Sequence, residues 1–101
     1  MTVEEFKVQC ALGTLSKNKL YSMASNKSTN KKILDILSRN KDIYIRIEVG
    51  NNSNTSKETL KTLSKDKTES VRWYVSRNPN VPRKALKEMV LSEGTKIWFD
   101  S

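Results

Sequence analysis

Five basic side chains recur at one fixed spacing and are suited to binding an anionic partner. Lys31, Lys57 and Arg83 are evenly spaced along the chain, and Lys61 and Lys87 repeat the same interval. Lysine supplies a compact charge, and arginine adds a planar group that contacts two oxygens at once. A line of such cations could follow phosphates or an acidic protein face. We take these five residues as the candidate binding site.

The charge of the whole chain favours the same class of partner. Nineteen Lys and Arg against eleven Asp and Glu give a net charge of +8, which attracts acidic proteins and nucleic acids. The excess is spread along the chain, and no block forms a basic tail. Two interpretations therefore stay open. Either the cations bind a partner, or they are the solvated outer face of amphipathic helices in a lysine-rich composition.

The residues on which most catalysis depends are scarce. Histidine is absent, which removes the commonest general base and the commonest metal ligand. Cys10 is the only cysteine, so the chain cannot form an internal disulfide and a reducing compartment is expected. The three glycines are widely separated and form no phosphate-binding loop. We therefore expect no catalytic residue, no metal site and no cofactor, and a protein that is not an enzyme.

Length and hydropathy indicate a single domain over residues 1–101, because 101 residues are enough for one hydrophobic core. No apolar stretch reaches the length that a membrane helix needs. The acidic start, Met1 to Glu5, is unlike a secretory leader. We therefore expect a cytoplasmic domain with no membrane partner.

An internal repeat organises the chain. Segments that begin at Asn26, Asn52 and Asn78 superpose, with similar residue types at many positions. We call a set of positions that are equivalent in these segments a column. The apolar columns are Leu34, Leu60 and Leu86; Leu37, Leu63 and Met89; and Met23, Val49 and Val75. Several coherent columns at one interval indicate a duplicated structural unit.

The residue pattern of each unit predicts a turn, a helix, a second turn and a second helix. Asparagine at the start favours a turn, and the spaced leucines that follow lie on one helical face. Thr55 to Glu58 has the pattern of a capping box. Residues 68–75 predict the second helix, but residues 43–49 alternate apolar and polar types as a strand does. Because the columns should share one backbone, we expect a helix at 43–49. Arg46 is expected to have a structural role, either as an ion pair with Asp42 or through a bond to a turn carbonyl of the neighbouring unit.

The two ends of the chain depart from the repeat. Residues 1–25 predict a degenerate cap unit, with Phe6 and Cys10 facing inward, before repeats at 26–51, 52–77 and 78–93. Residues 94–101 are expected to be a C-terminal tail that holds Ile97, Trp98 and Phe99. Such a segment either folds back as an end cap, which we favour, or supports self-association.

Residues 71–89 carry a recognisable pattern. Val71-Arg72, Val75, Asn78-Pro79 and Pro82, followed by spaced apolar residues, resemble the unit of the leucine-rich repeat variant family. The resemblance covers most of residues 23–90, and Gly50 and Ser76 replace the alanine of that family. It implies an all-α fold, a short right-handed α-solenoid of about three to four two-helix repeats, related in shape to HEAT repeats. It also implies a binding role without common chemistry.

We therefore expect a non-catalytic helical-repeat module that binds a protein partner through an acidic surface on that partner. The alternative is a nucleic-acid-binding protein that uses the basic ladder of Lys31, Lys57 and Arg83. Binding of nucleic acid would weaken steeply as the salt concentration rises.

Overall fold

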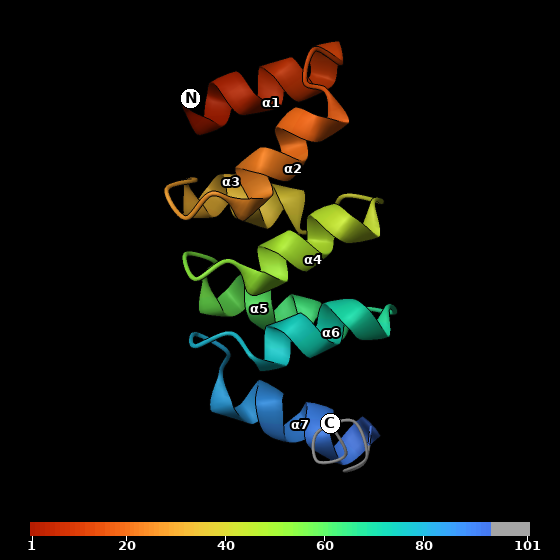
Figure 1. Ribbon diagram of the computed structural model, residues 1–101. Helices are drawn as coiled ribbons and strands as arrows, with labels where there is room; N and C mark the ends of the chain where they lie inside the picture. Colours follow the sequence, from red (N-terminus) through yellow and green to blue (C-terminus); the bar gives the residue numbers. More distant parts are fainter. Residues whose placement is uncertain (94–101) are drawn as a thin grey trace.

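A computed structural model describes residues 1–93, and every regular element in that range is an α-helix (Figure 1). The all-α prediction is confirmed for these residues, which contain no strand. The predicted end cap and self-association surface at Ile97, Trp98 and Phe99 lies outside the described residues. The helices are α1 (Val3–Leu12), α2 (Lys17–Ser25), α3 (Lys31–Leu37), α4 (Ile43–Asn51), α5 (Lys57–Leu63), α6 (Glu69–Ser76) and α7 (Arg83–Glu93).

The ambiguous segment at residues 43–49 belongs to α4, as the repeat predicted. Asp42 caps this helix, because its side chain accepts from the backbone N–H of Tyr44 at 2.8 Å. Ile45 and Val49 lie one helical turn apart and are both buried. The alternating pattern is therefore also compatible with a helix, because Ile45 and Val49 lie on the helical face that reaches the core.

The helices form two layers along the long axis of a molecule that measures 43 × 20 × 17 Å. In the nearer layer of Figure 1, α4 packs directly against α2 on one side and against α6 on the other. Behind them, α3 and α5 make no comparable contact with each other. Helices α2, α4 and α6 are therefore close neighbours, whereas α3 and α5 are spread apart.

The apolar columns form the core between the two layers. Leu34, Leu60, Val49 and Val75 are completely buried. Leu37, Leu63 and Met89 are also buried, whereas Leu86 of α7 is half-buried. Burying a leucine contributes roughly 2 kcal/mol relative to leaving it exposed. Each short helix presents few such residues, so neighbouring helices have to share one core.

Small residues let the even-numbered helices approach one another. Ala24 on α2 and Gly50 on α4 occupy one column, and both are buried. A Cβ atom placed on Gly50 would lie 3.1 Å from Val75 Cγ2 and 3.6 Å from the carbonyl oxygen of Val71. The column of small side chains therefore sets the close spacing of α4 and α6.

Buried asparagines connect each unit to the one before it. Asn52 Nδ2 donates to the carbonyl oxygens of Ala24 at 2.8 Å and Asn26 at 3.0 Å. Asn78 Nδ2 repeats this arrangement with Gly50 at 2.8 Å and Asn52 at 2.9 Å. Each side-chain oxygen also accepts from a backbone N–H two residues later, which fixes the turn. The asparagines predicted as turn formers thus also join successive units.

The predicted ion pair between Asp42 and Arg46 is wrong. Arg46 is buried, and its Nε lies 2.9 Å from Asp66 Oδ2 of the following unit. It also donates to Thr68 and to two backbone carbonyls of the loop before α4. Asp42 instead caps its own helix and forms an ion pair with Lys17, whose Nζ lies 2.7 Å from Asp42 Oδ2. Arg46 therefore joins two units instead of stabilising one helix.

Two local predictions also need correction. The N-cap of α5 is Ser56, whose side chain accepts from the N–H of Thr59, so the helix starts one residue later than the predicted capping box. Thr55 is buried and donates to the carbonyl of Val49 at 2.6 Å. In α1, Phe6 is buried but Cys10 is exposed, because α1 lies at the end of the molecule and has few neighbours.

Candidate binding surfaces

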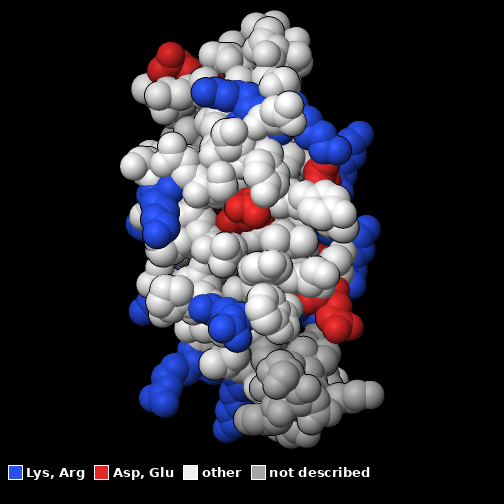
Figure 2. All heavy atoms as spheres, viewed as in Figure 1, with Lys and Arg blue, Asp and Glu red and all other residues white. Residues whose placement is uncertain are grey.

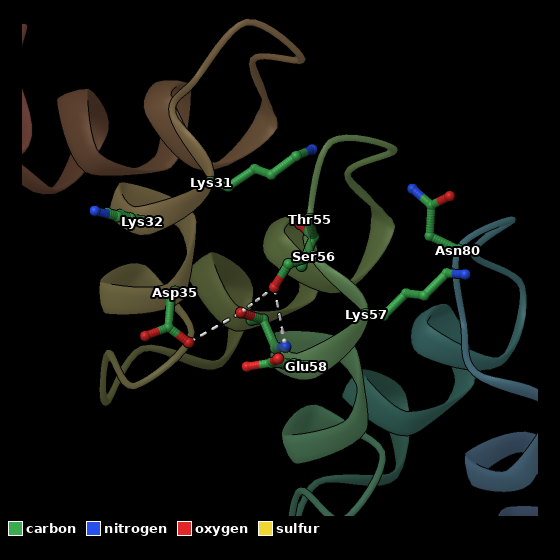
Figure 3. A pocket seen from close by; sticks show the side chains of 9 residues that line it. Lys31, Lys32, Asp35, Thr55, Ser56, Lys57, Glu58 and Asn80 are labelled. Carbon is green, nitrogen blue, oxygen red and sulfur yellow. Dashed lines mark hydrogen bonds between the residues drawn. The ribbon is translucent and has the colours of Figure 1, made fainter.

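Two of the predicted cations line one furrow between α3 and α5. Lys31 donates through Nζ to the side-chain oxygen of Asn54 at 2.6 Å and to its carbonyl at 3.0 Å. Lys57 stands in the same column, but within residues 1–93 its side chain has no hydrogen bond or ion pair. The furrow has a volume of about 700 Å³. Its lining residues are Lys31, Lys32, Asp35, Thr55, Ser56, Lys57, Glu58, Thr59 and Asn80 (Figure 3).

Hydrogen bonds from both helices form one wall of this furrow (Figure 3). Ser56 Oγ donates to Thr59 Oγ1 at 3.0 Å, and Thr59 Oγ1 donates to Asp35 Oδ1 at 2.9 Å. The furrow exists because α3 and α5 are spread apart. Its lysines share the space with two carboxylates, Asp35 and Glu58, so the furrow is not uniformly basic.

The other predicted cations lie elsewhere. Arg83 and Lys87 line a separate depression of about 540 Å³ on α7, beside the half-buried Leu86 and Val90. Lys61 is exposed in the last turn of α5. The structure therefore brings Lys31 and Lys57 together and puts Arg83 with Lys87 on another depression.

A second surface was not predicted as a site from the sequence. The outward residues of α4 are Tyr44, Ile47, Glu48 and Asn51, which follow the spacing of one helical stripe. The same columns continue on the helices to either side. We call these three stripes together the even-helix face; the other members are Asn18, Tyr21, Ser22 and Ser25 on α2 and Ser70, Trp73, Tyr74 and Arg77 at α6.

The even-helix face collects most of the aromatic side chains of residues 1–93. Tyr21 is 42% exposed, Tyr44 is 63% exposed, and Trp73 and Tyr74 are half-buried, whereas Phe6 is the one aromatic in the core of this range. The column of Tyr21, Ile47 and Trp73 is the sequence signal from which this surface could have been predicted. Short helices that already fill their core with aliphatic residues leave the larger rings outside.

Glu48 is at the centre of the even-helix face. Its Oε2 accepts a hydrogen bond from Tyr21 Oη at 3.1 Å, and Oε1 has no donor within the described part of the chain. The Glu48 carboxylate raises the pKa of Tyr21, and Tyr74 is near enough to add a smaller effect in the same direction. Tyr74 has the same column position on α6 as Glu48 has on α4. A half-buried carboxylate is thus flanked by tyrosines from both neighbouring helices.

Charge is distributed unevenly over this face. Figure 2 shows a mostly uncharged surface with one acidic group near the centre, and with Lys and Arg and further acidic groups toward the margins. At one margin the guanidinium of Arg77 lies 4.9 Å from the ring centre of Trp73, which in turn meets Tyr74 edge to face at 4.9 Å. Beside the centre, a depression of about 310 Å³ is lined by Tyr21 and Tyr44, among other residues.

Residues 1–93 were also compared with the patterns of a metal-ligand cluster and of a membrane-spanning helix. Between residues 1 and 93, no three side chains of the metal-ligating types His, Cys, Asp and Glu lie close together. The helices in this range are all too short or too polar to cross a membrane. Comparison of the chain with known protein families, with curated proteins and with solved structures found no match.

Proposed function

We propose that the chain is a non-catalytic helical-repeat module that binds a protein partner through an acidic surface on that partner. The observation that carries this proposal is the even-helix face, where Tyr21, Tyr44, Trp73 and Tyr74 are exposed or half-buried on adjacent helices. Tyrosine, tryptophan and arginine are the residues that most often dominate the binding energy of protein interfaces. The net charge of +8 supports an acidic partner.

The proposal includes the architecture. We infer a short right-handed α-solenoid of the leucine-rich repeat variant type, and what supports it is the recurrence of the same buried columns and asparagine bonds in successive units. Stacked repeats create extended surfaces that suit binding. A cytoplasmic setting is also part of the proposal, because the only cysteine, Cys10, is a free thiol.

Nucleic-acid binding is the second candidate. The side chains of Lys57, Arg83 and Lys87 have no hydrogen bond or ion pair within residues 1–93, so their charges are available to phosphates. Against this candidate, Asp35 and Glu58 share the furrow of Lys57. Phosphate-binding surfaces are strongly positive as a whole, which favours the protein partner.

One set of experiments separates the two candidates. The chain is titrated against labelled single-stranded and duplex nucleic acid at several salt concentrations, and is separately immobilised to capture proteins from an extract of the source cells. We expect one saturable protein partner and no salt-sensitive nucleic-acid binding. Micromolar binding of nucleic acid that disappears in the variant with Lys31, Lys57 and Arg83 all changed to Glu would establish the second candidate instead.

A further inference from the structure

The centre of the even-helix face is built to receive a positive charge, although the chain as a whole is basic. Glu48 is half-buried, and one of its carboxylate oxygens has no donor within residues 1–93. A partner that covered this carboxylate with an apolar or acidic group would leave a charge unpaired in a dry interface, which is strongly unfavourable. A basic side chain would supply the missing donor.

The neighbouring rings favour the same kind of ligand. Tyr21 reaches Glu48 from α2, and Tyr74 occupies the corresponding position on α6. The faces of aromatic rings attract ammonium and guanidinium groups, and the attraction grows when the pair is shielded from water. A carboxylate between two tyrosines therefore combines an ion pair with ring contacts for one cationic side chain.

The chain as a whole has the opposite charge. Figure 2 shows both basic and acidic groups at the margins of the face, and Arg77 is exposed at the margin on α6. A partner with basic residues throughout would be repelled by the net charge of +8, and a partner with acidic residues throughout would be repelled by Glu48 at the centre. Complementarity requires a basic residue in the middle of an otherwise acidic segment.

We propose that the even-helix face binds an acidic protein segment through one Arg or Lys of that segment, which pairs with Glu48 between Tyr21 and Tyr74. The inference rests on the proposed function and names its contact surface. The depression beside Tyr21 and Tyr44 then receives a neighbouring side chain of the same segment.

The test uses short random peptides displayed on phage and selected against the full chain. We expect enriched peptides to carry a single Arg or Lys flanked by Asp or Glu. A synthetic copy should bind Glu48→Gln about tenfold more weakly than the unchanged protein, because the ion pair is lost. Glu69→Gln is the matched control, since Glu69 is an exposed acid on α6 outside the face.

The variants preserve the fold by design. Glu48→Gln keeps an oxygen that accepts from Tyr21, and thermal unfolding checks that the fold is intact. Ser22→Lys is a second variant, because Ser22 is exposed in the column of Glu48 and its added ammonium would compete for the carboxylate. It should weaken binding to a similar extent.

The failures of the two proposals can be told apart. Enriched peptides that lack a basic residue, or that bind both Glu48→Gln and Ser22→Lys as tightly as the unchanged protein, would overturn the inference and leave the binding role in place. Selection that yields no saturable peptide would count against the proposed function as well as the inference.

Discussion

Asn26, Asn52 and Asn78 occupy one column, yet only the last two are buried. Asn52 is 3% exposed and Asn78 is 4% exposed, and each donates to two carbonyls of the preceding unit. Asn26 is exposed, and its side chain accepts only from the backbone N–H of Ser28 within residues 1–93. Burial of the amide, rather than residue type, therefore decides how much each asparagine contributes to stability.

Replacing Asn52 by alanine is expected to destabilise the fold by about 2–3 kcal/mol, because one buried and two partly buried hydrogen bonds to backbone groups are lost. Asn26→Ala is the matched control and should lower the free energy of unfolding by less than about 1 kcal/mol. Urea denaturation measures both. Equal losses in the two variants would show that the asparagine bonds between units do not stabilise the molecule.

Asp42 gives a second prediction at this scale. The ammonium of Lys17 and the backbone N–H groups of Tyr44 and Ile45 hold the pKa of Asp42 below its usual range. A lowered pKa in the folded state means that ionised Asp42 stabilises the fold above the ordinary carboxyl pKa of about 4. This contribution is lost as the pH falls through the folded-state pKa.

Asp42→Asn keeps the helix cap and removes the charge. The melting temperature of this variant should fall below that of the unchanged protein at neutral pH, and the difference should shrink as the solution is acidified. Thermal unfolding followed across the acidic range measures this effect. A difference that stays constant with pH would mean that the ion pair with Lys17 contributes nothing.

At the scale of the elements, the contact between α4 and α6 depends on Gly50. Leucine at this position would have to displace Val75, whose Cγ2 would be only 3.1 Å from a new Cβ atom. We expect Gly50→Leu to destabilise the fold by about 1–3 kcal/mol or more, through overpacking. Gly50→Ala should change stability by less than about 1 kcal/mol, because the gain in helix propensity offsets a small shift of Val75.

Asn51→Leu is the control for Gly50→Leu, because Asn51 is exposed in the same helix. Circular dichroism during denaturation compares the variants. A Gly50→Leu protein as stable as the Asn51→Leu protein would contradict the role of the small column in spacing the even-numbered helices.

At the scale of the whole molecule, the helices succeed one another along one axis, so the ends have fewer neighbours than the middle. In α1 only Phe6 is buried, whereas α4 buries Ile45, Arg46 and Val49 and contacts helices on both sides. Local opening needs less free energy where fewer apolar contacts are broken.

Amide hydrogen exchange should therefore be fastest in α1 and slowest in α4 among the helices over residues 1–76. The difference in exchange rate between α1 and α4 should be present at a pH where the fold is stable. Mass spectrometry of proteolytic fragments measures this difference. Uniform protection from α1 to α6 would indicate that the molecule opens only as one cooperative unit.

The repeat, the all-α character and most of the core could be predicted from the sequence alone. The columns of Leu34, Leu37 and Val49 predicted buried positions because a helical stripe has to be covered wherever it recurs. The same register predicted α4 against its local pattern. These properties depend on the order and spacing of apolar and polar residues along the chain, which a single sequence provides.

The contacts between side chains of different units could not be predicted without the folded structure. Arg46 pairs with Asp66 instead of Asp42, Lys31 bonds to Asn54, and Tyr21 reaches Glu48. The folded structure also divided the five predicted cations among different surfaces and brought the aromatic residues of three helices onto one face. Such contacts depend on the spacing of packed helices, which side-chain volumes at positions such as Gly50 determine only when the whole molecule is assembled.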